Sequence, residues 1–306
     1  MTLPAADPAP FSRAPVFVRA NKRHALASLA PALAVALLSL SGCATDPGAP
    51  SIAIRQQTAD AIAAQAAGGA ALQPRRIEGR LPLNAYLRQR DPTQPLTIYI
   101  EGDGLAFIDN KPTSNPTPVN PIGLRLAGAD PSANVAWLAR PCQYAGISAW
   151  DCGINFLWTT GRHAEQAVAA TMRGIDALVL PGQQIHLVGF SGGAANAALA
   201  AARRNDVLSL RTVAGTLDTV ALTTHFGEAP MTGSLNPAEI AARLARLPQR
   251  HYVGGHDPIV PRFAADNFLG HQSIPPGCQR LEIIPDATHV QGWVERWPQL
   301  LQQPLC

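Results

Sequence analysis

A serine set among glycines is the first candidate for chemistry. Ser191 lies in the motif G-F-S-G-G at 189–193, between the apolar run 185–190 and the alanine-rich segment 194–204. A strand that ends in a G-x-S-x-G motif and turns sharply into a helix holds its serine on a strained turn. Glycines two residues away then avoid a clash. The following helix presents N–H groups and a positive dipole end toward the turn. This pattern predicts that the Ser191 hydroxyl is a nucleophile, which needs a base to take its proton.

A carboxylate and a histidine follow two later apolar runs. Asp257 lies within the predicted strand and turn 250–260, and His289 ends the last predicted strand, 280–289. A histidine can take the serine proton when a carboxylate holds its other ring nitrogen. We therefore predict that Ser191, Asp257 and His289 come together as a catalytic set that performs acyl transfer through an acyl-enzyme.

The chain order of serine, acid and histidine resembles the α/β-hydrolase superfamily. The acid of that superfamily often stands in G-x-x-D-x-x-V-P, which matches G-G-H-D-P-I-V-P at 254–261. The resemblance extends over most of the chain through motif order and spacing. It implies that Ser191 is the nucleophile, His289 the base and Asp257 the residue that holds the histidine. Asp218 is an alternative acid, because some hydrolases of this fold take the acid one strand earlier.

A second glycine turn is a candidate for the oxyanion hole, the pair of donors that stabilises the negative oxygen of the intermediate. The segment E-G-D-G at 101–104 ends a predicted strand and resembles the H-G-x-G turn of esterases and lipases. Glu101 stands where those proteins have histidine. We expect the backbone N–H groups of Asp103 and Gly192 to form the hole.

Strands and helices alternate along the rest of the chain. Short apolar, β-branched runs separated by helices predict a mostly parallel sheet with helices on both faces, the α/β-hydrolase architecture. In such sheets ligands bind beyond the carboxyl ends of the strands. An opening hairpin is expected at 76–90, further strands at 96–104, 133–142, 183–190, 210–218, 250–260 and 280–289, and helices at 56–67, 161–180, 194–204 and 236–247.

The N-terminus has the features of an export signal. Basic residues precede the apolar run 25–40, which is shorter than the roughly 20 residues of a spanning helix. The run ends in L-S-G-C at 40–43, which resembles the lipobox of bacterial lipoproteins and implies cleavage before Cys43 and lipidation of that cysteine. Ala44 resembles the pattern that directs such proteins to the outer membrane. We therefore expect a lipid-anchored protein of the bacterial cell envelope.

These features divide the chain into three parts. Residues 1–42 are predicted to be the lipoprotein signal peptide, and residues 43–73 a tether rich in alanine, glycine and glutamine. Residues 74–306 are predicted to form the α/β-hydrolase domain, a length that fits one large domain better than two small ones.

Four cysteines remain after Cys43, an even number that suggests disulfides in an exported protein. They allow three connectivities, of which we favour the local pairs Cys142–Cys152 and Cys278–Cys306. The second bridge would enclose His289 in its loop and is expected to hold the C-terminus over it. No C-x-x-C motif or cysteine–histidine cluster has metal-ligand spacing, so no metal is expected.

Composition narrows the classes of function. The net charge is +3, and no basic stripe is interleaved with aromatic residues, so nucleic-acid binding is not indicated. The sequence predicts a lipid-anchored serine hydrolase that cleaves an ester or related acyl bond of a small-molecule substrate without any cofactor. A peptidase or thioesterase of the same fold is an alternative, as is a catalytically silent binding module of the envelope.

Overall fold

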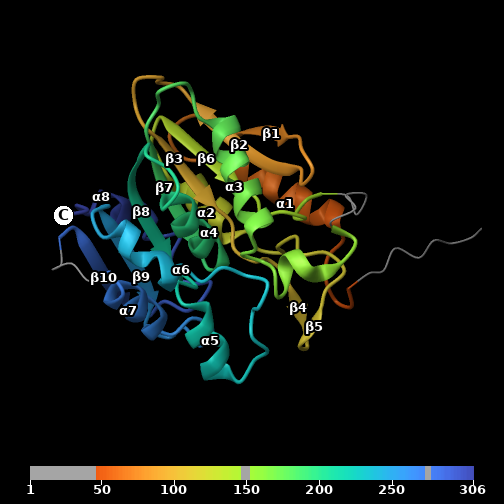
Figure 1. Ribbon diagram of the computed structural model, residues 1–306. Helices are drawn as coiled ribbons and strands as arrows, with labels where there is room; N and C mark the ends of the chain where they lie inside the picture. The colour runs from red at the N-terminus through yellow and green to blue at the C-terminus, as the bar shows by residue number, and fades with distance from the viewer. Residues whose placement is uncertain (1–45, 146–151, 273–276) are drawn as a thin grey trace, which may run out of the picture. The chain divides into compact units, whose positions relative to one another are not determined.

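An eight-stranded sheet forms the centre of the structure (Figure 1). The computed structural model describes residues 46–306 except 146–151 and 273–276, so Cys43 and the predicted signal peptide lie outside the described residues. The strand order is β1-β2-β6-β3-β7-β8-β9-β10. Strands β6, β3, β7, β8, β9 and β10 pair in parallel, whereas β2 runs antiparallel to both β1 and β6. The predicted fold class, a mostly parallel sheet, is confirmed.

The strands are β1 (Gln73–Ile77), β2 (Leu83–Gln89), β3 (Leu96–Ile100), β4 (Phe107–Ile108), β5 (Lys111–Pro112), β6 (Asn134–Leu138), β7 (Ile185–Phe190), β8 (Val207–Val213), β9 (Gln249–Gly254) and β10 (Gln279–Ile284). The helices are α1 (Ile52–Ala64), α2 (Ile122–Ala129), α3 (Glu165–Leu178), α4 (Gly192–Ala201), α5 (Thr219–Phe226), α6 (Pro237–Ile240), α7 (Phe263–Gly270) and α8 (Trp297–Gln302), with 3-10 turns η2 (Asn155–Trp158) and η3 (Ala241–Leu244).

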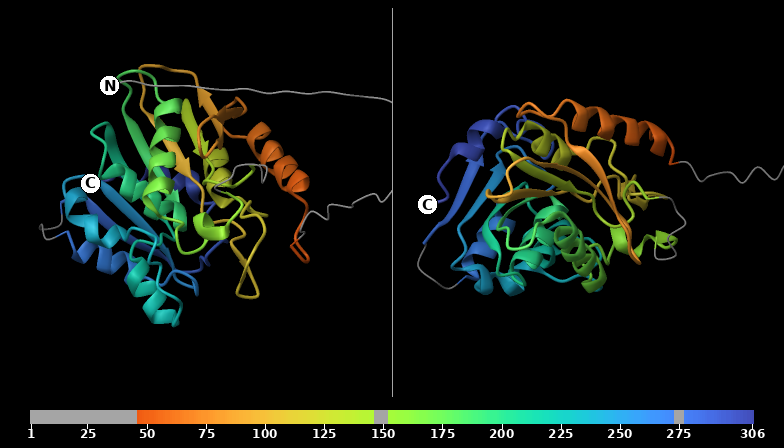
Figure 2. Two further views of the ribbon diagram at one scale, coloured as in Figure 1. Left: turned by 45° about the vertical axis from the view of Figure 1, so that its right-hand side comes forward. Right: turned by 90° about the horizontal axis from the view of Figure 1, so that it is seen from above.

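Helices cover both faces of the sheet, because side chains along the central strands alternate between two cores. In β3, Ile98 faces the core that α3, α4 and α7 share, and Tyr99 faces the core of α1, α2 and α8. Figure 2 shows these two groups of helices on opposite sides of the sheet. The central strands are therefore buried on both sides and form a rigid support for the turns at their ends.

The four predicted helices differ in extent from those observed, and two of the differences have a clear local cause. Helix α1 begins at Ile52 rather than 56, because the Ser51 side chain caps it by accepting a hydrogen bond from the Ile54 N–H (3.3 Å). The predicted helix 236–247 is divided into α6 and the 3-10 turn η3. Residues three apart eclipse each other in a 3-10 helix, so Ala241 and Leu244 both reach the core.

The chain reverses direction across the sheet at β3, which lies between β6 and β7. After β3 the chain crosses to β6, and α3 then returns it to β7 on the other side. The carboxyl ends of β3 and β7 therefore flank the switch point where ligands bind in open α/β sheets. In Figure 1 the β4–β5 hairpin and α5 extend from this edge.

Both favoured disulfides are present, but one lies at the carboxyl ends of the parallel strands and the other at their amino ends. Cys142–Cys152 follows the carboxyl end of β6, near the switch point. Cys278 immediately precedes β10, so Cys278–Cys306 lies at the amino end of that strand. His289 falls inside the loop that this second bridge closes, yet it follows the opposite end of β10. The expectation that the bridge holds the C-terminus over the histidine is therefore wrong.

Membrane-spanning helices and metal sites are both absent from the described part of the chain. No helix within it has the length and apolar character needed to cross a bilayer. No group of three or more histidine, cysteine or carboxylate side chains within it is arranged to hold a metal ion.

Candidate active site

Ser191 occupies a strained turn between β7 and α4. Its backbone has φ +50° and ψ −123°, a combination rarely adopted by residues with a side chain. The turn is held from both sides, because the Ser191 N–H donates to the Val213 carbonyl (2.9 Å) and its carbonyl accepts from the Ala194 N–H (3.0 Å). Such strain persists only where the surroundings enforce it, and it projects the hydroxyl from the carboxyl edge of the sheet.

The motif glycines are required by close backbone contacts. A Cβ at Gly189 would lie 2.3 Å from the Ala194 Cα, and one at Gly193 would lie 2.3 Å from the Ile100 carbonyl oxygen. A Cβ at Gly192 would lie 2.0 Å from an oxygen of Asp103. These separations leave no room for a side chain, so the glycines allow α4 to begin directly behind the serine.

The three side chains singled out from the sequence meet at this turn. His289 Nε2 lies 3.0 Å from Ser191 Oγ, and His289 Nδ1 lies 2.9 Å from Asp257 Oδ2. The other carboxylate oxygen of Asp257 accepts from the N–H groups of Ile259 (2.8 Å) and Val260 (2.9 Å). A carboxylate accepts and does not donate, so the Nδ1 of His289 carries the proton and its Nε2 is left to accept the serine proton.

Two loops position the acid and the histidine together. A Cβ at Gly255 would lie 2.3 Å from the Pro285 carbonyl oxygen, so the turn after β9 passes directly against the turn after β10. The His256 N–H donates to the Ala287 carbonyl (2.9 Å). Buried Trp293 then donates its indole N–H to the Thr288 carbonyl (2.9 Å) and holds the segment that carries the histidine. The sequence motifs do not predict a role for Trp293 at this site.

Asp218, the alternative acid, has other partners. Its Oδ1 accepts from the Ala221 N–H (3.1 Å) and from Asn236 Nδ2 (3.1 Å), and its Oδ2 accepts from Asn267 Nδ2 (3.0 Å). Burial opposes ionisation of this carboxyl, but these donors together lower its pKa. Asp218 thus caps α5 and links it to neighbouring segments, while His289 bonds to Asp257.

The glycine turn after β3 lies against the serine. A Cβ at Gly102 would be 3.3 Å from the Ser191 Cβ. Within the described residues, neither the Asp103 N–H nor the Gly192 N–H donates a hydrogen bond. An oxyanion hole needs backbone donors near the serine hydroxyl that are free to bind the substrate oxygen, so both N–H groups remain candidates for that role.

Glu101 stands at the position of the histidine in an H-G-x-G turn, and its buried side chain anchors the turn after β3. It is 1% exposed, and its oxygens accept from four N–H groups. The donors are the backbone of Gly102 (3.0 Å), Gly123 (3.1 Å) and Leu124 (3.0 Å) and the indole of Trp137 (2.9 Å). Burial raises the pKa of Glu101, and these donors oppose that rise. The carboxylate therefore joins the turn to the N-terminus of α2.

The Asp103 side chain is held by two arginines. Arg140 Nη1 lies 3.0 Å from Oδ1, and Arg162 Nε lies 3.5 Å from Oδ2. Burial opposes ionisation of Asp103, but Arg162 and Arg140 outweigh it and lower the pKa. Neighbouring His163 is fully buried, and burial together with Arg140 lowers its pKa to about 3, so it is neutral. The sequence had given no reason to connect these residues with the turn.

Comparisons with known proteins identify the fold. No protein-family model matches the sequence, and no curated protein is significantly similar to it. The esterase domain of a Rhodothermus marinus protein superposes with a TM-score of 0.50 at 15% identity, covering 75% of this chain and 94% of that one. Est1E from Butyrivibrio proteoclasticus, with ferulic acid bound, gives 0.52 at 17% identity and covers 74% and 97%. A puromycin hydrolase gives 0.51 at 17% identity, covering 76% of this chain but 38% of that one.

The chain has the α/β-hydrolase fold. In this fold the serine turn, the acid and the histidine follow three strands of one sheet in chain order, and here they follow β7, β9 and β10. The strand order places the turn after β3 next to the turn after β7.

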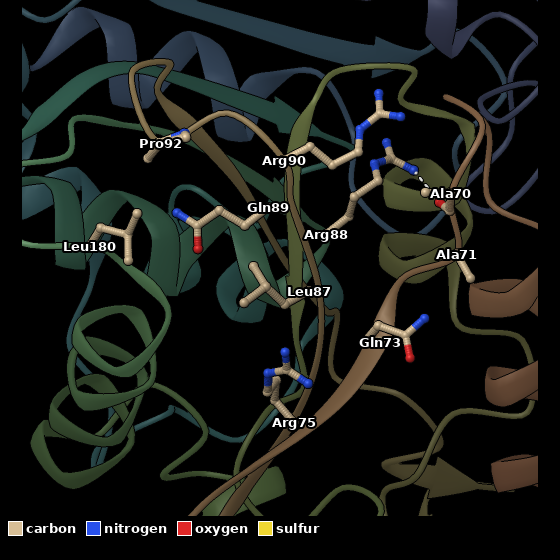
Figure 3. Close-up of a pocket in the computed structure, with 10 residues that line it drawn as sticks. All are labelled: Ala70, Ala71, Gln73, Arg75, Leu87, Arg88, Gln89, Arg90, Pro92 and Leu180. Atoms are coloured by element: carbon tan, nitrogen blue, oxygen red, sulfur yellow. Dashed lines mark hydrogen bonds between the residues drawn. The ribbon is translucent and has the colours of Figure 1, made fainter.

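A surface hollow of about 600 Å³ lies elsewhere on this α/β-hydrolase fold (Figure 3). It is lined by β1, the end of β2 and the end of α3, which places it at the amino edge of the parallel strands. Its buried cation, Arg88, donates to the backbone carbonyls of Ala70 (2.9 Å), Asp130 (2.7 Å) and Ser132 (2.8 Å). These contacts tie surface segments together, so Arg88 has a structural role.

Proposed function

We propose that this protein is a serine hydrolase that cleaves an ester or a related acyl bond. One observation carries the proposal: Ser191, His289 and Asp257 form a continuous hydrogen-bonded relay, with the serine on a strained turn. A buried serine–histidine contact alone is common, but the addition of an oriented carboxylate and two backbone donors is the arrangement that acyl transfer needs.

In the proposed reaction, Ser191 Oγ attacks the carbonyl carbon of the substrate while its proton passes to His289 Nε2. The carbonyl oxygen becomes an oxyanion, which the N–H groups of Asp103 and Gly192 stabilise. Collapse of this intermediate expels the alcohol, which takes the proton from the histidine and leaves an acyl-serine. Water then attacks the acyl group with the same histidine as base, and the carboxylic acid departs. Asp257 holds the imidazole and stabilises it while it is charged.

We expect the substrate to carry an apolar acyl or alkyl group, because exposed apolar side chains follow the carboxyl ends of the strands. Most of the exposed large apolar side chains in the described residues lie on segments that follow carboxyl ends of strands, on the same edge as Ser191. These are Phe107, Val119, Ile154, Val220, Phe226, Ile259 and Val290. A series of p-nitrophenyl esters of increasing chain length tests this expectation. Each buried methylene should lower the activation free energy by about 0.8 kcal/mol and so raise kcat/KM about fourfold, until the chain outgrows the surface.

An activity probe tests the hydrolase itself. A fluorophosphonate should label the folded, disulfide-intact protein, and Ser191→Ala should abolish the label. The chain offers a matched control in Ser209, which is fully buried and lies 2.8 Å from His186 Nδ1. Ser209→Ala removes a serine–histidine contact away from the strained turn and should leave labelling unchanged. A folded wild-type protein that resists the probe would favour the silent binding module instead.

The type of acyl bond is tested by comparing leaving groups. We propose an ester rather than an amide or thioester, since an esterase domain and the esterase Est1E are among the proteins that share this fold. Matched p-nitrophenyl ester, p-nitroanilide and thioester substrates with one acyl group separate the three. An anilide preference would make the peptidase alternative the better description.

We also propose that the enzyme is anchored by lipid at Cys43 in the bacterial envelope, with the outer membrane as its site. The lipobox-like L-S-G-C at 40–43 supports this. Radiolabelled palmitate should label the wild-type protein and not Cys43→Ser, and equal labelling of the two would remove the anchor.

A further inference from the structure

The peptide group that joins Gly102 to Asp103 is held in one orientation. The Gly102 carbonyl accepts a hydrogen bond from Gln143 Nε2 (2.8 Å), and the Gly102 N–H donates to Glu101 (3.0 Å). In a trans peptide the carbonyl and the following N–H point in opposite directions. Because Gln143 holds the carbonyl, the Asp103 N–H is directed away from Gln143, and Gly102 itself lies against Ser191.

We infer that Gln143 is a positioning residue for the oxyanion hole, one that fixes the Gly102–Asp103 peptide with its N–H toward the reacting oxygen. Rotation of this peptide would replace the N–H with the Gly102 carbonyl oxygen. A carbonyl oxygen at that position repels the oxyanion instead of stabilising it. The inference rests on the proposed function and adds to it a residue that touches neither substrate nor relay.

Gln143 is itself held firmly. Its side chain is 1% exposed, and its Oε1 accepts from the Arg140 N–H (3.0 Å). One end of the amide therefore meets a donor and the other an acceptor, which fixes its orientation. The preceding residue, Cys142, is bonded to Cys152, so the turn that carries Gln143 is covalently closed.

The same short turn also holds the side chain of Asp103. Arg140 Nη1 pairs with the Asp103 carboxylate (3.0 Å) while Gln143 holds the peptide before it. Gly104 completes the fit, since its φ is +69° and a Cβ there would lie 2.8 Å from Gln143 Nε2. Main chain and side chain of Asp103 are thus both set by the segment 140–143.

Two substitutions test the role of the Gln143 donor. Gln143→Met keeps the length of the side chain but removes its hydrogen-bonding groups, and Gln143→Glu keeps the shape but cannot donate when ionised. Removal of an oxyanion donor costs roughly 10²–10³ in kcat, and loosening one should cost about 10- to 100-fold. We expect this loss in kcat for hydrolysis of a short p-nitrophenyl ester, with KM changed less than about threefold.

Gln143→Glu also provides a rescue that a purely structural role would not produce. A protonated glutamic acid can donate to the Gly102 carbonyl, and burial raises the pKa of a carboxyl. The ratio of Gln143→Glu to wild-type kcat should therefore rise as the pH falls from 8 toward 5.5. The corresponding ratio for Gln143→Met should stay constant.

Gln183 is a matched control at the other edge of the sheet. It is buried, accepts from the N–H three residues earlier (Leu180, 3.2 Å) and donates to a backbone carbonyl (Gln94, 2.9 Å), as Gln143 does. Gln183→Met and Gln183→Glu should leave kcat within about twofold of wild type. Thermal unfolding and thiol counting establish that each variant is folded with intact disulfides.

The outcomes separate this inference from the proposed function. A wild-type protein without esterase activity or fluorophosphonate labelling removes both. An active wild type whose Gln143 variants retain full kcat per site, counted by labelling to completion, removes the positioning role alone. Equal kcat losses at Gln143 and Gln183, or a ratio for Gln143→Glu that does not change with pH, would also overturn it.

Discussion

The carboxyl edge and the amino edge of the central sheet both contain a buried glutamine and a disulfide, but these have different roles. At the carboxyl edge, Gln143 holds a backbone carbonyl and adjoins the Cys142–Cys152 disulfide, and at the amino edge Gln183 holds the carbonyl of Gln94. The second disulfide, Cys278–Cys306, also lies at the amino edge. At the carboxyl edge the held groups surround a strained serine and leave backbone donors unused, whereas at the amino edge they join segments to one another.

This contrast shows that a buried hydrogen bond has no function of its own. The bond from Gln143 matters to the proposed chemistry because the same peptide carries the Asp103 N–H, which we propose as a donor of the oxyanion hole. The bond from Gln183 satisfies a buried carbonyl and stabilises the fold. Substitutions at the carboxyl edge should therefore change rate, and those at the amino edge should change stability.

The largest expected effect is that of Asp257→Asn. An asparagine amide can donate to His289 Nδ1, which would place the imidazole proton on Nε2 and leave no base for Ser191. We expect kcat/KM to fall by about 10³–10⁴, measured with p-nitrophenyl esters.

Asp218→Asn is the matched control for this substitution. It should leave kcat within about threefold and lower the free energy of unfolding by about 1–2 kcal/mol, since an asparagine can still cap α5 but its NH2 group cannot accept the hydrogen bond that Asn267 Nδ2 donates to Asp218 Oδ2. A larger rate loss for Asp218→Asn than for Asp257→Asn would reverse the assignment of the acid.

The two disulfides give the next largest effects and separate the edges directly. Their cysteines are 10 and 28 residues apart, so removal should cost about 3 kcal/mol for Cys142→Ser with Cys152→Ser and between about 3 and 4 kcal/mol for the other pair. Urea unfolding measures both. Only the first pair should also lower kcat, by about tenfold, because Gln143 adjoins Cys142. Equal kcat for the two double variants would contradict the prediction that only the disulfide at the carboxyl edge affects the rate.

The smallest effect on rate is expected at a position outside the relay, where the prediction concerns stability in acid. Fully buried His251 has its pKa lowered to about 3 by burial, from 6.5 in the unfolded chain. Below pH 6.5 the unfolded state binds a proton that the folded state does not, so stability falls as the pH drops from 6.5 toward 3. The slope is up to about 1.4 kcal/mol per pH unit.

His251→Asn should reduce this slope by one proton and leave kcat at neutral pH unchanged. The Asn side chain can retain the hydrogen bond that Thr212 makes to His251 Nδ1 (2.8 Å). Urea unfolding between pH 4 and 7 measures the slope. An unchanged slope would mean that His251 also titrates when folded.

Sequence patterns predicted much of the sheet and the residues that meet at its carboxyl edge. Strand ends can be located from apolar runs, and parallel strands bring their carboxyl ends together, so the convergence of Ser191, Asp257 and His289 follows from topology. The sharp turn of Ser191 was predictable because its glycines report close backbone contacts.

The contacts of Gln143 and Arg140 were not predictable in this way. Glutamine and arginine occur throughout protein surfaces and interiors, and which carbonyl or carboxylate they reach depends on the path of a turn closed by a disulfide. The position of Cys278–Cys306 was misjudged for a related reason. Separation along the chain tells how long a loop is, but not at which edge of the sheet its ends meet.

Strand β1 is an outermost strand of the sheet, and its residues affect whether another chain can pair with it. Four of its five residues are exposed, among them Pro74, Arg75 and Arg76. Proline cannot donate to an added strand, and two guanidinium groups would lose hydration if another chain docked there. The border of the sheet formed by β1 therefore discourages pairing with a strand of another molecule.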